Sequence, residues 1–333
     1  MSFIRGGTER YRAILRNLAT DLLEGKCLLF LGAGASVDPD QPDLPTANEL
    51  SADMARDCEL EWHEYIPLST IAFYYESFHT RAGLNRFLVS RIGNARIRPS
   101  KTIQLLIEAI EAVEKRGRTT IAITTNYDRQ FESAYEERLK RRPEIVIYKG
   151  AWNPNDKEKI LNCTPEGELK GYAQFWRPRL RTVLYKMHGC ISQPERQGLV
   201  ITEEDYINFL ANALGEHNGD KTILNYVRGE FAMSTILFIG YSLSDWNFRA
   251  IFKATVESRL DKKDNRSYAV QFRDPTKQES ELEQARWDSV IDFWNEKKVD
   301  IISVTGQQFM RDLLDLLALQ VAELEASTVG PST

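Results

Sequence analysis

Cys27-Leu28-Leu29-Phe30-Leu31-Gly32-Ala33-Gly34-Ala35-Ser36 is the segment from which the fold can be predicted. Its first half is a short continuous apolar run, which is typical of a strand buried on both faces of a parallel sheet. Its second half carries two glycines separated by one residue, and glycine permits a tight turn and a close approach of the backbone. The backbone N–H groups of such a turn bind a phosphate in some proteins and form an ordinary strand-to-helix connection in others, and both interpretations stay open.

Three further motifs of glycine and polar residues each follow an apolar run. They are Thr124-Thr125-Asn126-Tyr127-Asp128, Lys186-Met187-His188-Gly189 and Gly240-Tyr241-Ser242-Leu243-Ser244-Asp245. Other strand-like runs lie at 145–148, 268–270 and 301–304, and helical patterns lie at 127–141, 204–214, 219–232, 245–259 and 278–297. This alternation predicts an α/β fold, with a Rossmann-like parallel sheet and helices on both faces. The carboxyl ends of its strands form a ligand-binding crevice, and all four motifs fall there.

The remaining segments predict one large domain over residues 1–325. A helix is expected at 8–24, and Thr46-Ala47-Asn48-Glu49 has the pattern of a capping box that opens another helix. Helical patterns dominate 46–116, which we interpret as a smaller helical module inserted after the first strand. The segment 149–181 is rich in Trp, Pro, Gly and charge, and we expect an irregular excursion there. The small, polar segment 326–333 predicts a disordered tail.

The composition is that of a water-soluble globular protein. Of the 333 residues, 42% are hydrophobic and 27% are charged, and the formal net charge of −5 argues against a general electrostatic grip on nucleic acid. No apolar run is long enough to span a membrane. The four cysteines are scattered, with no Cys-x-x-Cys pair, so we expect neither a metal site nor a disulfide framework. A reducing cytoplasm is the expected location.

The glycine turn lacks the marks of two common nucleotide-binding classes. A dinucleotide fingerprint would place a third glycine where Val37 stands, and no acidic residue follows at the end of a second strand. The Gly-Lys-Ser/Thr sequence of a P-loop is also missing. These absences disfavour a standard dehydrogenase and an NTPase.

Asn126, Asp128 and His188 are the candidate chemical groups. An asparagine amide can hold a water or a ribose hydroxyl, and Asp128 can fix the turn; alternatively, either residue caps the following helix. His188 ends an apolar run beside Gly189, where an imidazole is suited to proton transfer, although a lone histidine is more commonly a satisfied core residue. After the last motif strand, Gly240 allows a close approach, Ser242 offers a hydroxyl, and Asp245 either lines the site or caps a helix.

In this order the motifs resemble the sirtuin superfamily, and they look closest to bacterial sirtuin-like domains of antiviral defence systems. The resemblance implies a NAD-binding role for the glycine turn and for the polar residues after the other strands. It assigns the cradle to Gly32, Ala33, Gly34 and Ser36, the ribose–nicotinamide pocket to Asn126 and Asp128, and the adenosine side to Gly240 and Ser242. Thr125 and Asp245 are expected to be further NAD-binding residues. His188 corresponds to the catalytic base and Asn126 to the residue that positions water or ribose hydroxyls.

The chain departs from protein-deacylating sirtuins in one respect. Those enzymes carry two Cys-x-x-Cys pairs for a structural zinc soon after the His-Gly, whereas here Cys190 is the single cysteine of that region. Relatives without these cysteines tend to hydrolyse NAD.

The resemblance thus implies an NAD glycohydrolase that acts as the effector of a bacterial anti-phage defence system. It also implies control, by homo-oligomerisation or by a partner such as a HerA-type DNA-translocating ATPase or a short Argonaute. The alternatives are a NAD-dependent protein deacylase and a non-catalytic NAD or ADP-ribose sensor.

The last helical pattern, at 307–324, is more apolar than one buried face requires. Leu313, Leu317, Val321 and Leu324 follow helical spacing, and Met310, Leu314 and Leu316 widen the stripe. Either a partner covers the extra surface or the helix is wedged into its own core on two sides.

Overall fold

The structure is a computed structural model, and it describes thirteen segments of the chain. These are residues 3–37, 44–63, 66–93, 97–148, 160–163, 169–171, 182–192, 198–214, 233–243, 249–250, 252–253, 266–273 and 279–328. The helical patterns expected at 219–232 and over most of 245–259 lie outside them.

The described part of the chain forms one ten-stranded sheet around β2 (Cys27–Leu31). β2 pairs in parallel with β3 (Ile121–Thr124) on one side and with β8 (Thr235–Ile239) on the other. Beyond β3 lie β7 (Val183–Lys186) and β4 (Glu144–Tyr148), and beyond β8 lie β9 (Ser267–Val270), β10 (Val299–Ser303) and β1 (Ile4–Arg5). All of these neighbours are parallel. The chain therefore leaves β2 toward one side and returns on the other, which makes β2 the switch point of the sheet.

Three strands of the sheet were not predicted. β1 is only two residues long and is held by pairing with β10, which comes from the far end of the chain. β5 (Ile160–Cys163) and β6 (Leu169–Gly171) lie in the segment expected to be irregular, and they extend the sheet beyond β4 in antiparallel fashion.

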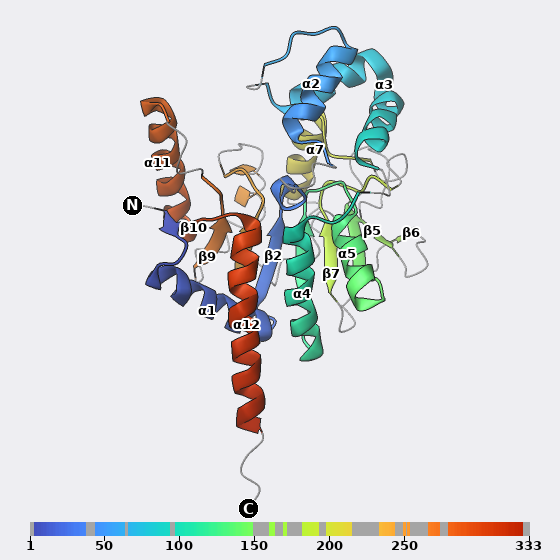
Figure 1. The fold of residues 1–333 in the computed structure, drawn as a ribbon. Helices are drawn as coiled ribbons and strands as arrows, with labels where there is room; N and C mark the ends of the chain where they lie inside the picture. Colours follow the sequence, from blue (N-terminus) through green and yellow to red (C-terminus); the bar gives the residue numbers. More distant parts are fainter. Residues whose placement is uncertain are drawn as a thin grey trace, which may run out of the picture.

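Helices cover both faces of the sheet, as predicted (Figure 1). Alternate residues of β2 enter different cores: Leu29 and Leu31 face one, and Leu28 and Phe30 face the other. The first core is covered by α1 (Glu9–Leu23), α4 (Lys101–Lys115), α5 (Gln130–Leu139) and α12 (Gly306–Thr328). The second receives residues of α7 (Glu203–Leu214) and α11 (Glu281–Glu296). This arrangement confirms the Rossmann-like α/β fold.

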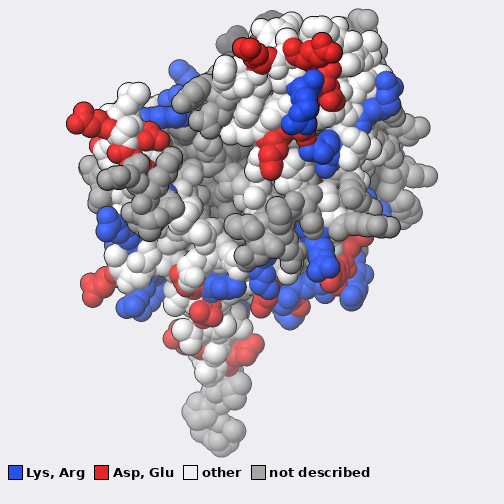
Figure 2. Space-filling view, turned by 45° about the horizontal axis from the view of Figure 1, so that its top comes forward, with Lys and Arg blue, Asp and Glu red and all other residues white. Residues whose placement is uncertain are grey.

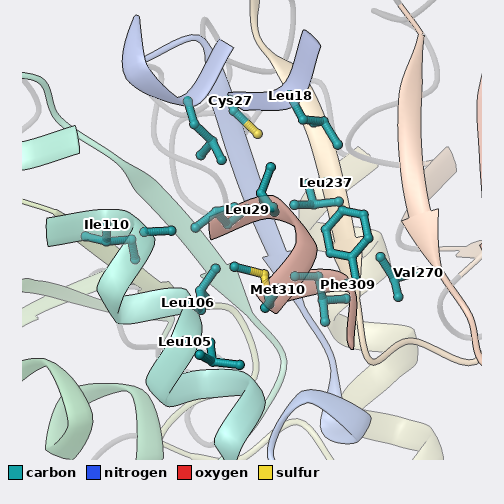
Figure 3. Packing of buried hydrophobic residues seen from close by; sticks show 14 of the residues in the cluster. Leu18, Cys27, Leu29, Leu105, Leu106, Ile110, Leu237, Val270, Phe309 and Met310 are labelled. Atoms are coloured by element: carbon teal, nitrogen blue, oxygen red, sulfur yellow. The ribbon is translucent and has the colours of Figure 1, made fainter. Parts of the chain in front are cut away.

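A separate helical module is built from α2 (Ala47–Asp57) and α3 (Leu68–Ile92), which share a core of their own. The capping box expected at Thr46 and Glu49 is confirmed at the start of α2. The module is smaller than the helical segment 46–116, because α4 packs on the sheet instead. Figure 3 shows Leu106 and Ile110 of α4 beside Leu29 of β2.

An ion pair between Arg81 and Asp205 joins the helical module to α7. The Arg81 guanidinium donates two hydrogen bonds to the Asp205 carboxylate, at 2.7 and 2.9 Å. Asp205 Oδ2 also accepts from the N–H groups of Ile201 and Thr202, at 3.1 and 2.9 Å, at the start of α7. In Figure 1 the module lies above the sheet edge that carries the four motifs.

The C-terminal helix packs against both α1 and α4, and its last turns extend beyond them (Figure 1). Phe309, Met310, Leu313 and Leu317 are fully buried, and Leu314, Leu316 and Val321 pack against the same core. The apolar surface up to Val321 is therefore used within the chain, in agreement with the second of the two interpretations, whereas Leu319 and Leu324 are exposed. α12 continues to Thr328, so the first residues of the segment expected to be a tail are helical; 329–333 lie outside the described residues.

Candidate functional site

The loops after β2, β3, β7 and β8 meet at the carboxyl edge of the sheet. Strand register places Leu31 beside Thr124 and Ile239, and Thr124 beside Lys186, so the following residues leave neighbouring strands together.

In the view of Figure 2, Lys and Arg are interspersed with Asp and Glu over the helical module, with no large area of one sign. No helix among the described residues is both long and apolar enough to cross a membrane.

The glycine turn is held by backbone hydrogen bonds, both within itself and to the end of β8. Gly32 and Gly34 donate to the carbonyl oxygens of Ile239 and Gly240, at 2.9 and 2.8 Å. The N–H groups of Ala35 and Ser36 bond back to Gly32 and Ala33 within the turn. Ala33 is exposed, and among the described residues its N–H donates no such bond. The turn thus bonds two of its N–H groups to the end of β8 and two within itself, and it leaves Ala33 exposed.

Gly240 is required by close packing. Its φ of +77° is unfavourable for other residues, and a Cβ at this position would lie 2.0 Å from the Ala35 nitrogen. A Cβ on Gly32 or Gly34 would in turn lie 2.7 or 3.0 Å from the Gly240 carbonyl oxygen. These three glycines allow the turns after β2 and β8 to touch.

Asn126 ties the turn after β3 to the glycine turn. Its Nδ2 donates to the Gly32 carbonyl oxygen at 3.0 Å and to Ser36 Oγ at 2.9 Å. Its Oδ1 is buried and has no hydrogen-bond partner among the described residues. Since buried polar atoms are rarely left unpaired, this oxygen is an acceptor in need of a donor.

The predicted neighbours of Asn126 are placed at the same edge. Thr125 Oγ1 lies 2.9 Å from the Tyr241 hydroxyl, which links the loops after β3 and β8. Asp128 Oδ1 accepts from the Gln130 N–H at 2.8 Å and so fixes the turn before α5, whose N-cap residue is Arg129. Ser242 is exposed, whereas Asp245 lies outside the described residues.

His188 is buried in an aromatic box, with 3% of its surface exposed. The rings of Tyr206 and Phe209 from α7 lie edge-on to the imidazole at 5.2 and 5.5 Å, and Tyr127 lies at 6.5 Å. Burial lowers the pKa of His188 from 6.5 to about 3, so the ring is neutral at neutral pH. Its Nε2 is buried and, within the described part of the chain, has no hydrogen-bond partner. His188 is thus a neutral imidazole next to the loop of Asn126, with Nε2 as the ring nitrogen that has no partner among the described residues.

The lowered pKa of His188 makes stability depend on pH. Below pH 6.5 the unfolded chain takes up a proton that the folded protein refuses, so stability falls as the pH drops from about 6.5 toward 3. Because one proton is involved, the free energy of unfolding falls by about 1.4 kcal/mol per pH unit in this range. The loss is about 2 kcal/mol at about pH 5. Urea unfolding of wild type and His188→Gln at about pH 7 and about pH 5 measures this loss of stability. The variant should lack this loss; an equal loss in both proteins would contradict the neutral, buried imidazole.

A group of residues behind the site was not predicted from the sequence. Gln130 donates to the Ser36 carbonyl oxygen at 2.9 Å and accepts from the Ser100 N–H at 2.7 Å. Ser100 Oγ donates to the Ala35 carbonyl oxygen at 2.5 Å. These contacts hold the glycine turn from below. Gln130 lies two residues after Asp128, but nothing in its spacing indicated burial.

Comparison with known proteins assigns the family. A family model described as a SIR2-like domain matches residues 120–302, which is more than half of the chain. The chain therefore belongs to the SIR2-like domain family, and the match includes the motifs after β3, β7 and β8. No curated protein matches the sequence.

Two solved structures are similar over nearly the whole chain. One comes from work on the structural basis for the mechanism and regulation of Sir2 enzymes; it is 14% identical, covers 92% of this chain and 98% of its own, and has a TM-score of 0.42. The other is Sir2Af2 bound to a myristoylated histone peptide, which is 12% identical, covers 95% and 100%, and has a TM-score of 0.40. Similarity at this level says nothing about the substrate of the present chain.

Proposed function

We propose that the protein is an NAD glycohydrolase that releases nicotinamide and ADP-ribose. The observation that carries the proposal is the pair of buried polar atoms, Asn126 Oδ1 and His188 Nε2, neither of which has a partner among the described residues. Membership of the SIR2-like family supports NAD as the substrate. Nicotinamide in NAD is a cationic leaving group, so its bond to ribose breaks through an oxocarbenium-like state without protonation of the leaving group.

In this reaction each candidate residue has a separate role. Asn126 Oδ1 accepts a hydrogen bond from a ribose hydroxyl or from the attacking water and so orients it. The ring of His188 is neutral at working pH, and its Nε2 accepts the proton that the ribose hydroxyl or the attacking water loses. Ala33, exposed at the glycine turn, offers its N–H toward phosphate oxygens, and Ser36 anchors the same turn. For the remaining candidates we propose the NAD-binding roles that the resemblance implies: Asp128 on the ribose–nicotinamide side, Gly240 and Ser242 on the adenosine side, and Thr125 and Asp245 as further NAD-binding residues.

Incubation with NAD followed by chromatography of the products tests this function. We expect nicotinamide and ADP-ribose in equal amounts, without an acylated peptide. Nicotinamide release that depends on an acyl-lysine peptide would instead identify a protein deacylase. Saturable NAD binding without any cleavage would identify a sensor.

We further propose that the activity serves bacterial anti-phage defence and is controlled. Unrestrained NAD hydrolysis would harm the cell that makes the enzyme, so a restraint is needed. A homo-oligomer, a HerA-type DNA-translocating ATPase and a short Argonaute are the candidates suggested by the motif resemblance. NAD incubation is therefore best carried out with and without the product of the neighbouring gene.

Catalysis should not require zinc. Among the described residues, no group of three or more His, Cys, Asp or Glu is placed to hold a metal ion, and Cys58 and Cys190 lie in different cores. Changing Cys58, Cys163 and Cys190 to serine should leave NAD cleavage largely intact, because the usual paired thiolate ligands are missing. Activity and metal content of the purified variant check this. Stoichiometric zinc in wild type, lost together with activity on chelation, would refute it.

A further inference from the structure

A buried ion pair lies directly behind the loop of Asn126. Lys186, the last residue of β7, and Glu132, in the first turn of α5, have side chains only 1% and 2% exposed. Lys186 Nζ lies 3.1 Å from Glu132 Oε1. The other carboxylate oxygen, Oε2, is buried and has no hydrogen-bond partner among the described residues. The pair is therefore fully desolvated but incompletely satisfied.

The ammonium also holds the backbone of the site. Lys186 Nζ donates a hydrogen bond to the Asp128 carbonyl oxygen, two residues after Asn126. Asp128 Oδ1 in turn accepts from the Gln130 N–H, and Gln130 Nε2 donates to the Ser36 carbonyl oxygen. Lys186 thus fixes one end of the turn whose other end presents Asn126 to the glycine turn.

Stability does not explain this arrangement. Replacing a buried ion pair with apolar residues of similar volume is often neutral or stabilising, because two desolvated charges rarely recover their hydration energy. Burial alone would lower the pKa of Lys186, but nearby Cys190, Glu132 and Asp128 raise it above its ordinary value. The ammonium therefore stays charged and keeps all its hydrogens for donation at working pH. The buried Lys186 ammonium is therefore better explained by its hydrogen bond to the Asp128 carbonyl oxygen, which holds the loop in place.

We propose that Lys186 and Glu132 form a positioning pair, in which Lys186 fixes the Asp128 carbonyl and thereby the orientation of Asn126 in the crevice. Glu132 keeps the ammonium in place. The pair does not touch the substrate, and its effect on turnover rests on the proposed NAD cleavage.

The decisive variant is the apolar pair Lys186→Met/Glu132→Leu. Its urea-unfolding midpoint should stay near or above that of wild type. Its kcat for NAD cleavage should fall about 10- to 100-fold with KM little changed, because the reacting groups are misplaced. Glu132→Gln, which keeps the Lys186 ammonium and offers it an amide oxygen, should retain most of the activity. Lys26→Met/Glu24→Leu, an exposed pair at the opposite end of β2, is the matched control and should change neither quantity.

Hydrogen exchange gives a readout independent of NAD. Backbone amides of 125–130 should exchange faster in the apolar double variant than in wild type, and not in the control pair. If wild type cleaves no NAD, the proposed function fails, but this exchange result still decides the positioning role. A well-folded double variant with wild-type kcat and unchanged exchange would overturn the proposal. If the double variant does not fold, Lys186→Met/Glu132→Gln takes its place, and the same kinetic and exchange results support or overturn the positioning role.

Discussion

Replacing Asn126 with alanine should reduce NAD cleavage by at least about 10²-fold, within the range for loss of an electrostatic or proton-transfer group. The substitution removes Oδ1, the buried acceptor without a partner among the described residues, together with both Nδ2 bonds to the glycine turn. His188→Ala should cause a loss of similar size, because it removes the second such acceptor. Steady-state kinetics measure both effects, and circular dichroism checks that the variants fold.

Ser36→Ala is the matched control for Asn126. It removes one of the two contacts that anchor the Asn126 amide but leaves Oδ1 in place. If Asn126 acts on the substrate, Ser36→Ala should lower NAD cleavage far less than Asn126→Ala does. Equal losses in the two variants would mean that Asn126 serves only to anchor the glycine turn, and near-wild-type turnover in Asn126→Ala would remove it from the mechanism altogether.

Gly240→Ala should be the most destabilising single-atom addition at the site. The new Cβ would lie 2.0 Å from the Ala35 nitrogen and 2.6 Å from the Gly34 carbonyl carbon, and both are backbone atoms. The positive φ costs about 1–2 kcal/mol for any residue with a Cβ, and the collision adds about 2 kcal/mol. Urea unfolding measures the total, and NAD cleavage should fall with it because the two turns are forced apart.

Gly117 provides the control for backbone strain alone. Its φ of +70° is similar, but a Cβ there would meet nothing within 4 Å. Gly117→Ala should therefore lose only the conformational part of the stability. Equal losses at Gly117 and Gly240 would show that the contact between the two turns is not tight.

The sequence was informative where polar motifs and strand ends coincide. The four motifs predicted the edge at which the loops meet, because parallel strands buried on both faces leave apolar runs that end abruptly. Asp128 accepts from the N–H two residues further on, in keeping with the interpretation that it fixes the turn, whereas the N-cap of α5 is Arg129. β1 was not predicted, because it depends on pairing with a strand from the other end of the chain and no local pattern records that.

The supporting residues were not predicted for a different reason. A lysine at the end of a strand usually extends into solvent, so the burial of Lys186 follows only from its packing with Glu132 of α5. Likewise, the sequence placed Asn126 at the crevice but did not show that its Nδ2 is committed to the glycine turn, which leaves Oδ1 as its available end. Side-chain hydrogen bonding between distant segments is set by packing rather than by spacing.

Release of nicotinamide from NAD, compared between wild type and Asn126→Ala at equal protein concentration, is the sharpest test of the proposed chemistry. We expect nicotinamide and ADP-ribose in equal amounts from wild type, with at least about a 10²-fold lower rate from the variant. Intact NAD recovered from wild type, with and without the neighbouring gene product, although NAD binds saturably, would contradict the proposed cleavage.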